Sequence, residues 1–138
     1  MRLIPDTNIL VRALTNDDRE QSPEAQRILA EAELVAVTTT TLCELCWVLL
    51  RSYKIHRQHV ALAIERLARS ENVELDRPAV EAGLALLTAG GDFADGIIAH
   101  QGEWLGGETF VSFDRKAISL LKAANKLTLV PGDPSPSH

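Results

Sequence analysis

The chain has 138 residues, of which 46% are hydrophobic, 24% charged and 4% aromatic, which predicts one globular domain and excludes a disordered or collagenous chain. Its longest apolar run has six residues, far short of a membrane span, and its start lacks the apolar stretch of a signal peptide. The formal net charge of −5 at pH 7 is unusual for a nucleic-acid-binding protein.

Short apolar strands and helices alternate along the chain. In chain order the predicted elements are a strand at 2–5, helices at 7–14 and 22–32, a strand at 34–37, helices at 42–53 and 56–70, a strand at 73–75, helices at 76–89 and 92–105, a strand at 109–112, a helix at 114–124 and a strand at 127–130. The strands show no two-residue period, which is typical of strands buried on both faces. We therefore predict an α/β fold, a three-layer α/β/α sandwich with a central, mainly parallel sheet.

No repeat or internal boundary interrupts this alternation. We expect a single domain over residues 1–130 and a flexible tail over 131–138, which holds three of the six prolines. Cys43 and Cys46 have C-x-x-C spacing without a second pair, so we expect buried thiols and a reducing, cytoplasmic location.

Five acidic residues stand at positions where strands end or helices begin. They are Asp6, Glu44, Asp92, Asp95 and Asp114. The carboxyl ends of parallel strands share one edge of a sheet, so we expect these side chains to converge on one cleft. The acidic excess of the chain equals these five residues, and its net charge therefore does not decide what the protein binds.

Helix capping is the alternative explanation for each acid taken alone. Asp6 and Asp114 are ordinary N-cap residues, each expected to stabilise its helix by about 1 kcal/mol. Thr41 to Glu44 and Asp92 to Asp95 have the spacing of capping boxes. Capping does not require a charged residue at every site, however. Several carboxylates in one place repel one another unless a divalent cation lies among them, and Mg²⁺ prefers oxygen ligands.

Four short segments in this order resemble the PIN-domain family. They are Asp6-Thr7-Asn8, Leu42-Cys43-Glu44-Leu45, the run from Asp92 to Ala99, and Ser112-Phe113-Asp114-Arg115. The resemblance extends to about Val130 and is strongest to the VapC-type ribonuclease toxins of type II toxin–antitoxin systems. Gly96 stands where that family more often has Ala, Ser112 where Thr is usual, and Pro5 is an unusual residue before the first acid.

The resemblance implies a metal-dependent endoribonuclease that uses Mg²⁺ or Mn²⁺. By resemblance, Asp6, Glu44, Asp95 and Asp114 match the catalytic and metal-binding quartet, and Asp92 is an accessory ligand. Asn8 and Ser112 match the polar positions that orient the quartet or a water. The implied partners are an RNA substrate, a cognate antitoxin and a second copy in a homodimer, without a membrane.

The same residues suggest the chemistry. A metal held by the acids would polarise the scissile phosphate and lower the pKa of a bound water, which attacks in line. Arg115 and Lys116 follow Asp114 and are candidates for contact with RNA phosphate; a solvated helix start explains them equally well.

Other candidate residues are weaker. His56 and His59 could share a helix face as metal ligands, yet no acid lies near them in sequence, and His100 is expected at a helix surface. Trp47, Leu50 and Tyr53 have helical spacing, which usually indicates core. By resemblance, helices of that region can instead form dimer or antitoxin surfaces.

Two other classes of function compete with the ribonuclease. A haloacid-dehalogenase-type phosphatase with Asp6 as phosphoryl acceptor requires a second Asp at position 8, where this chain has Asn8. A phospho-receiver domain requires a central acceptor Asp together with a downstream Lys, and no such set stands out in the sequence. A PIN-like module that binds RNA or protein without cleavage is the second alternative, although all four acids are present.

Overall fold

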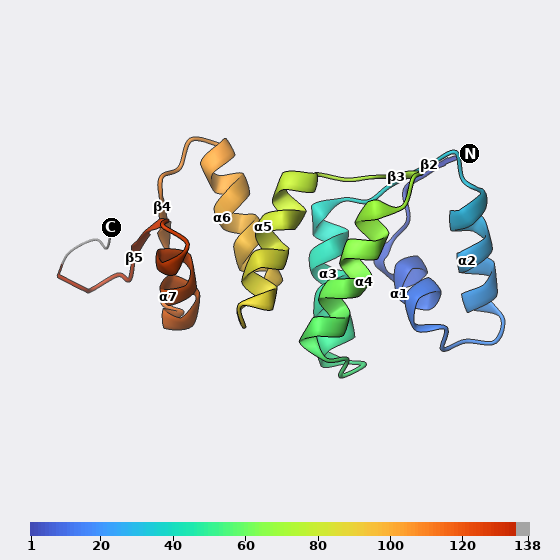
Figure 1. The fold of residues 1–138 in the computed structure, drawn as a ribbon, viewed down its shortest axis with the longest axis horizontal. Helices are drawn as coiled ribbons and strands as arrows, with labels where there is room; N and C mark the ends of the chain where they lie inside the picture. The colour runs from blue at the N-terminus through green and yellow to red at the C-terminus, as the bar shows by residue number, and fades with distance from the viewer. Residues whose placement is uncertain (135–138) are drawn as a thin grey trace. The chain divides into compact units, whose positions relative to one another are not determined.

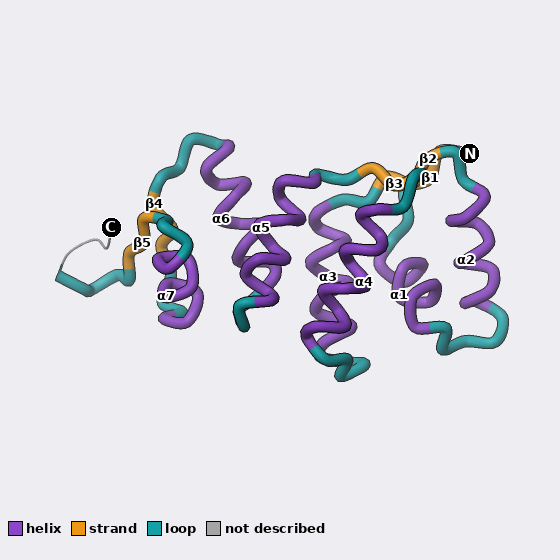
Figure 2. The backbone as a smooth tube through the Cα atoms, in the orientation of Figure 1, coloured by secondary structure: helices purple, strands orange, loops and turns teal. Residues whose placement is uncertain are grey.

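A computed structural model describes residues 1–134, and it divides the chain into two compact units, Met1–Arg77 and Pro78–His138. Residues 1–134 form seven helices and five strands. Figure 1 labels these elements along the chain, and Figure 2 colours helices, strands and loops differently. Every strand pairing within residues 1–134 is parallel, as the sequence predicts. The last four residues of the predicted tail, 135–138, lie outside the described residues.

The first unit contains a three-stranded sheet and four helices. In chain order its elements are β1 (Arg2–Leu3), α1 (Thr7–Thr15), α2 (Gln21–Glu31), β2 (Leu34–Ala36), α3 (Thr39–Arg51), α4 (Arg57–Arg69) and β3 (Val73–Glu74). The strand order is β1-β2-β3, with Leu3 opposite Val35 and Val35 opposite Val73. Helix α1 packs against α2 and α3, and α3 packs against α4. The core of this unit is built from fully buried aliphatic side chains: Leu10, Val35, Leu42, Leu45, Leu49, Val60 and Ile64.

The second unit contains a two-stranded sheet and three helices. Its elements are α5 (Arg77–Thr88), α6 (Phe93–Trp104), β4 (Thr109–Val111), α7 (Arg115–Ala123) and β5 (Leu127–Leu129). Strands β4 and β5 pair with Phe110 opposite Thr128, and α7 packs against β5. The buried side chains of this unit come mainly from its helices: Val80, Leu86, Leu87, Phe93, Ile97, Ala117 and Leu121.

Two helices begin earlier than the sequence predicts, because other residues accept the N–H groups at their starts. Helix α2 starts at Gln21 rather than Ser22, and the Oδ1 atom of Asp18 accepts the N–H groups of Glu20 and Gln21 at 2.9 and 2.7 Å. The predicted cap, Ser22, is instead fully buried inside the helix. Helix α3 starts at Thr39 rather than Leu42, since Thr38 caps it by accepting the N–H of Thr41 at 3.2 Å.

Helices α5 and α6 approach each other closely at a pair of glycines. A Cβ atom at Gly96 would lie 2.4 Å from the carbonyl oxygen of Ala82 and 2.8 Å from the Cα of Gly83. A Cβ at Gly83 would in turn lie 2.8 Å from the ring of Phe93. The absence of side chains at these positions therefore sets the distance between the helix that carries Asp95 and its neighbour.

We expect Gly96→Ala to destabilise the protein by about 1–3 kcal/mol, although alanine is the better helix former. The added methyl group meets backbone atoms of α5, which cannot move aside without shifting the helix. Urea unfolding of both proteins measures the difference. A variant as stable as the natural chain would contradict the close approach, and Gly102→Ala on the same helix, where no atom lies within 4 Å of the added Cβ, is the matched control.

No helix within residues 1–134 is both long enough and apolar enough to cross a membrane.

Candidate functional site

Asp6 lies directly before α1 and caps it. Its Oδ1 atom accepts the N–H of Ile9 at 3.0 Å, and its backbone is extended, as is usual for an N-cap residue. The carboxylate is exposed and has no other hydrogen-bond or ion-pair partner among the described residues. One oxygen of Asp6 thus fixes the start of α1 and the other is free for a ligand.

Glu44 has a different role from the capping box that its spacing predicts. Because α3 begins at Thr39, Glu44 lies in the second turn, where it cannot close back onto the N-cap. Its Oε1 atom accepts a hydrogen bond from the hydroxyl of Thr7 at 3.1 Å. Since Thr7 is the first residue of α1 and follows Asp6, Glu44 is held at the helix start that Asp6 caps. The capping-box interpretation of Glu44 is wrong.

Asn8 is exposed in the first turn of α1 and lines a hollow between α1 and α2. The volume of this hollow is about 290 Å³.

In the second unit, Asp92 and Asp95 lie at the start of α6. Asp92 is the N-cap, and its Oδ1 atom accepts the N–H of Ala94 at 2.8 Å. The predicted reciprocal bond, in which the carboxylate of Asp95 accepts from the backbone of Asp92, is not formed. Asp95 is half-buried, and its carboxylate accepts no hydrogen bond from residues 1–134. Asp92 therefore caps the helix, whereas Asp95 does not.

Asp114 caps α7. Its Oδ1 atom accepts the N–H groups of Lys116 and Ala117 at 3.0 and 3.2 Å. The hydroxyl oxygen of Ser112 accepts the N–H of Asp114 at 3.0 Å, which fixes the turn between β4 and α7. Ser112 is thus positioned to orient Asp114, the kind of role that the resemblance assigns to it.

The acids of the second unit form a repulsive cluster. The pKa of Asp95 is raised above its ordinary value, first by burial and then by the negative charges of Asp92 and Asp114. Within residues 1–134 none of these three carboxylates forms an ion pair with a cationic side chain. The positive ends of α6 and α7 favour the ionised carboxylates, but backbone dipoles supply only partial charges. This cluster (Asp92, Asp95 and Asp114) concentrates negative charge without a counter-charge from a side chain.

The chemistry of this cluster fits a hard divalent cation. Carboxylate oxygens are the ligands that Mg²⁺ prefers, and the charge of a bound cation would offset both the burial and the repulsion that raise the pKa of Asp95. Among the described residues, no three His, Cys, Asp or Glu side chains are already arranged as a metal-holding group. The fit therefore rests on donor type and charge.

Arg115 and Lys116 follow Asp114 at the start of α7 and differ in their partners. The two Nη atoms of Arg115 donate to the two carboxylate oxygens of Asp133 at 3.3 and 3.2 Å, and Asp133 raises the pKa of Arg115. Lys116 is exposed and has no ion pair in the described part of the chain.

The remaining sequence candidates lie outside both groups of acids. Cys46 is buried, as predicted, whereas Cys43 is only half-buried. His56 caps α4, and the ring of His59 lies edge-on to it at 6.1 Å between ring centroids. Trp47 is 59% exposed, so its prediction as a core residue is wrong. His100 was expected at the helix surface and is half-buried, and its Nε2 atom is buried without a hydrogen-bond partner among residues 1–134.

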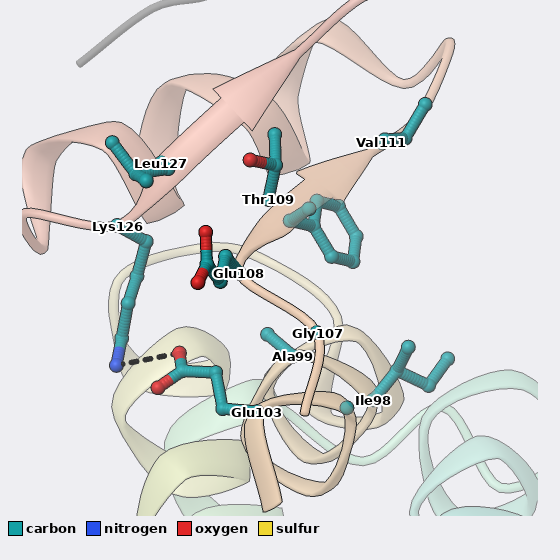
Figure 3. A pocket seen from close by; sticks show the side chains of 11 residues that line it. Ile98, Ala99, Glu103, Gly107, Glu108, Thr109, Val111, Lys126 and Leu127 are labelled. Carbon is teal, nitrogen blue, oxygen red and sulfur yellow. Dashed lines mark ion pairs between the residues drawn. The ribbon is translucent and has the colours of Figure 1, made fainter. Parts of the chain in front are cut away.

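A hollow of about 240 Å³ lies between α6 and β4 and contains none of the predicted site residues (Figure 3). Lys126 and Glu103, which both line it, form an ion pair of 2.8 Å. Sequence reasoning missed the contact of Thr7, whose hydroxyl donates to Glu44. Its signal was a hydroxyl directly after a candidate ligand at a helix start.

A family profile for the PIN domain matches residues 3–124, and the chain belongs to the PIN domain family. The match confirms the predicted PIN-like fold of the three-layer α/β/α class. PIN domains are commonly nucleases that act on nucleic acid, and they usually bind divalent metals. No curated protein matches the chain in a sequence search.

Proposed function

We propose that this protein is an endoribonuclease that hydrolyses RNA phosphodiester bonds with Mg²⁺ or Mn²⁺, and that it is a VapC-type toxin of a type II toxin–antitoxin pair. The observation that supports this most directly is Asp95, a half-buried carboxylate with a raised pKa, repelled by two neighbouring acids and without a partner among the described residues. An acid whose role is to cap the helix would accept a backbone N–H, as Asp92 does.

In this proposal, Asp6, Glu44, Asp95 and Asp114 are the catalytic and metal-binding residues, and Asp92 is an accessory ligand. The metal, when bound, lowers the pKa of a water and neutralises charge on the phosphate. The chain's own residues hold the carboxylates: Thr7 orients Glu44, Ser112 fixes the turn at Asp114, and Asn8 orients a water or a ligand. Lys116 and, on release from Asp133, Arg115 contact RNA phosphate.

We also propose that residues 1–130 act as one PIN domain in the cytoplasm, with a cognate antitoxin and a second copy of the chain as partners. The exposed Trp47 on α3 supports a protein-binding surface in this region, because large apolar side chains gain most from burial at interfaces.

The test is cleavage of a structured RNA mixture by protein shown to be free of any co-purified small protein. We expect cleavage with Mg²⁺ or Mn²⁺, none with EDTA, and 5′-phosphate ends on the products. No cleavage of any RNA, together with no Mn²⁺ binding by calorimetry, would overturn the proposal. The protein would then be a PIN-like binding module whose acids at Asp6, Asp92 and Asp114 are helix caps.

Thr7→Val is expected to lower the cleavage rate about tenfold, the loss typical when a group that orients a metal ligand is removed. Valine has nearly the same shape as threonine but cannot donate to Glu44, so the carboxylate loses its fixed position. Single-turnover kinetics at saturating Mg²⁺ measures the rate. The matched control is Thr15→Val at the other end of α1, which loses a hydrogen bond to the backbone of Val11 and touches no proposed ligand. Equal effects of the two variants would contradict a special role for Thr7.

A further inference from the structure

The hollow between α1 and α2 is small and is lined by both apolar and polar side chains. Ile9, Ala25 and Ile28 supply its apolar atoms. Its volume of about 290 Å³ is at or below the lower limit of pockets for drug-sized ligands, roughly 300–1,000 Å³, so it suits a single planar ring system. Asn8, which also lines it, is two residues from Asp6, so the hollow lies beside a residue of the proposed active site.

Arg12 lines the hollow with a guanidinium whose orientation is fixed. Its Nε donates to the amide oxygen of Gln21 at 2.8 Å, and its Nη1 donates to both carboxylate oxygens of Asp17 at 3.1 and 2.9 Å. The hydroxyl of Tyr53 donates to Asp17 at 2.6 Å and holds that carboxylate in turn. The Nη2 atom of Arg12 has no acceptor within residues 1–134. Arg12 is thus a rigid group with two N–H donors available to a ligand.

Glu24 lines the same hollow with a carboxylate that is only half used. Its Oε2 atom accepts from Arg27 at 2.7 Å in an exposed ion pair, and its Oε1 atom has no partner in the described residues. The hollow therefore combines a donor group from α1 with an anionic acceptor group from α2.

This combination matches the edges of one nucleobase. Guanine carries two adjacent N–H donors, N1–H and the N2 amino group, which a carboxylate accepts, and it carries the acceptors O6 and N7, which arginine reads. Adenine, cytosine and uracil have no pair of adjacent donors on the ring edge. Proteins that recognise RNA by sequence commonly take unstacked bases into such sites.

We propose that the hollow between α1 and α2 binds an unpaired guanine of the substrate RNA, with Glu24 and Arg12 as its recognition groups. This inference rests on the proposed ribonuclease function and names its substrate class, single-stranded RNA that contains guanine. Specificity then comes from the first unit, beside the residues proposed to bind metal there.

The test measures binding without cleavage. The full chain is titrated in EDTA against four fluorescent heptanucleotides, each with a central G, A, C or U flanked by three uridines on either side, and anisotropy reports the affinity. We expect the guanine oligonucleotide to bind on the order of tenfold more tightly than the other three. Glu24→Gln is expected to remove this preference, because the amide has no negative charge and presents an NH2 donor in place of one acceptor oxygen to the N–H donors of guanine.

Glu31→Gln is the matched control. Glu31 lies on the same helix and pairs with the same arginine, Arg27, at 2.9 Å, but it does not line the hollow. The control is expected to keep the tenfold preference, because Glu31 does not line the hollow. The two variants are matched because each loses one negative charge and one ion pair.

Equal affinity for all four oligonucleotides, or equal loss in both variants, would overturn the inference. Cleavage with Mg²⁺ but without guanine preference would overturn the guanine site and leave the proposed ribonuclease function standing. Guanine preference without cleavage would support the hollow as a base site and overturn the ribonuclease function. No binding of any oligonucleotide would overturn the guanine site, and cleavage of RNA with Mg²⁺ would then still decide the ribonuclease.

Discussion

Asp95→Asn is expected to reduce metal-dependent cleavage about 1,000-fold and, in the absence of metal, to make the protein more stable. Activity falls because the amide carries no charge for the metal. Stability rises because the half-buried carboxylate loses solvation on folding and is repelled by Asp92 and Asp114. Active sites typically contain residues that destabilise the fold, whereas a residue that serves the fold alone stabilises it.

The stabilisation has a defined pH dependence. The pKa of Asp95 in the folded chain is raised above its ordinary value of 3.8. At a pH between 3.8 and this raised pKa, the folded state therefore binds more protons than the unfolded state. Through Asp95, the free energy of unfolding of the natural chain therefore increases as the pH falls through this window. The advantage of the asparagine variant is largest at pH 7 and disappears at a pH below 3.8.

Thermal unfolding in EDTA at several pH values measures this difference. We expect a Tm about 2 °C higher for the variant at pH 7, a modest rise because water partly screens the cluster. Mn²⁺ should raise the Tm of the natural chain and have little effect on the variant, since the cation binds only where the charge is present. Glu81→Gln, which removes an exposed acid on α5 outside the cluster, is the control. A Tm that falls in Asp95→Asn would contradict the repulsive cluster.

The types of the elements could be predicted from sequence, because each depends on a local pattern. The alternation of apolar strands with helices predicted parallel pairing, and the strands pair in parallel within β1-β2-β3 and within β4-β5. Helix starts were less predictable where several residues compete to cap. Four threonines precede Leu42, and any of them can accept a capping bond. Thr38 does so, and this choice places Glu44 a turn further into α3.

The environment of single side chains could not be predicted, because it depends on segments far apart in sequence. The hydrogen bond from Thr7 to Glu44 joins residues 37 positions apart, and the ion pair between Arg115 and Asp133 spans 18. Trp47 shows the limit of apolar periodicity. The buried face of α3 is formed by Leu42, Leu45 and Leu49, and position 47 lies about 200° around the helix from position 45.

Asp114 combines both roles that the sequence left open, capping and metal binding, and two substitutions separate them. Asparagine caps helices as well as aspartate does, so Asp114→Asn should keep the bonds to Lys116 and Ala117 and leave the free energy of unfolding nearly unchanged. It should nevertheless lower cleavage at least about 100-fold, because the negative charge is lost. Asp114→Ala should lose the same activity and also about 1 kcal/mol of stability.

The control for this pair is Asp18, which is not a proposed ligand and whose Oδ1 atom also accepts two N–H groups at a helix start, those of Glu20 and Gln21 just before and at the first residue of α2. Asp18→Ala should lose about as much stability as Asp114→Ala and keep the cleavage activity. Urea unfolding and cleavage rates of the four variants, Asp18→Asn included, give the comparison. If Asp114→Asn cleaves RNA at the natural rate, Asp114 is a cap alone. Since capping is equally satisfied by an uncharged residue, only a loss of activity on removal of the charge explains why the chain has aspartate at this position.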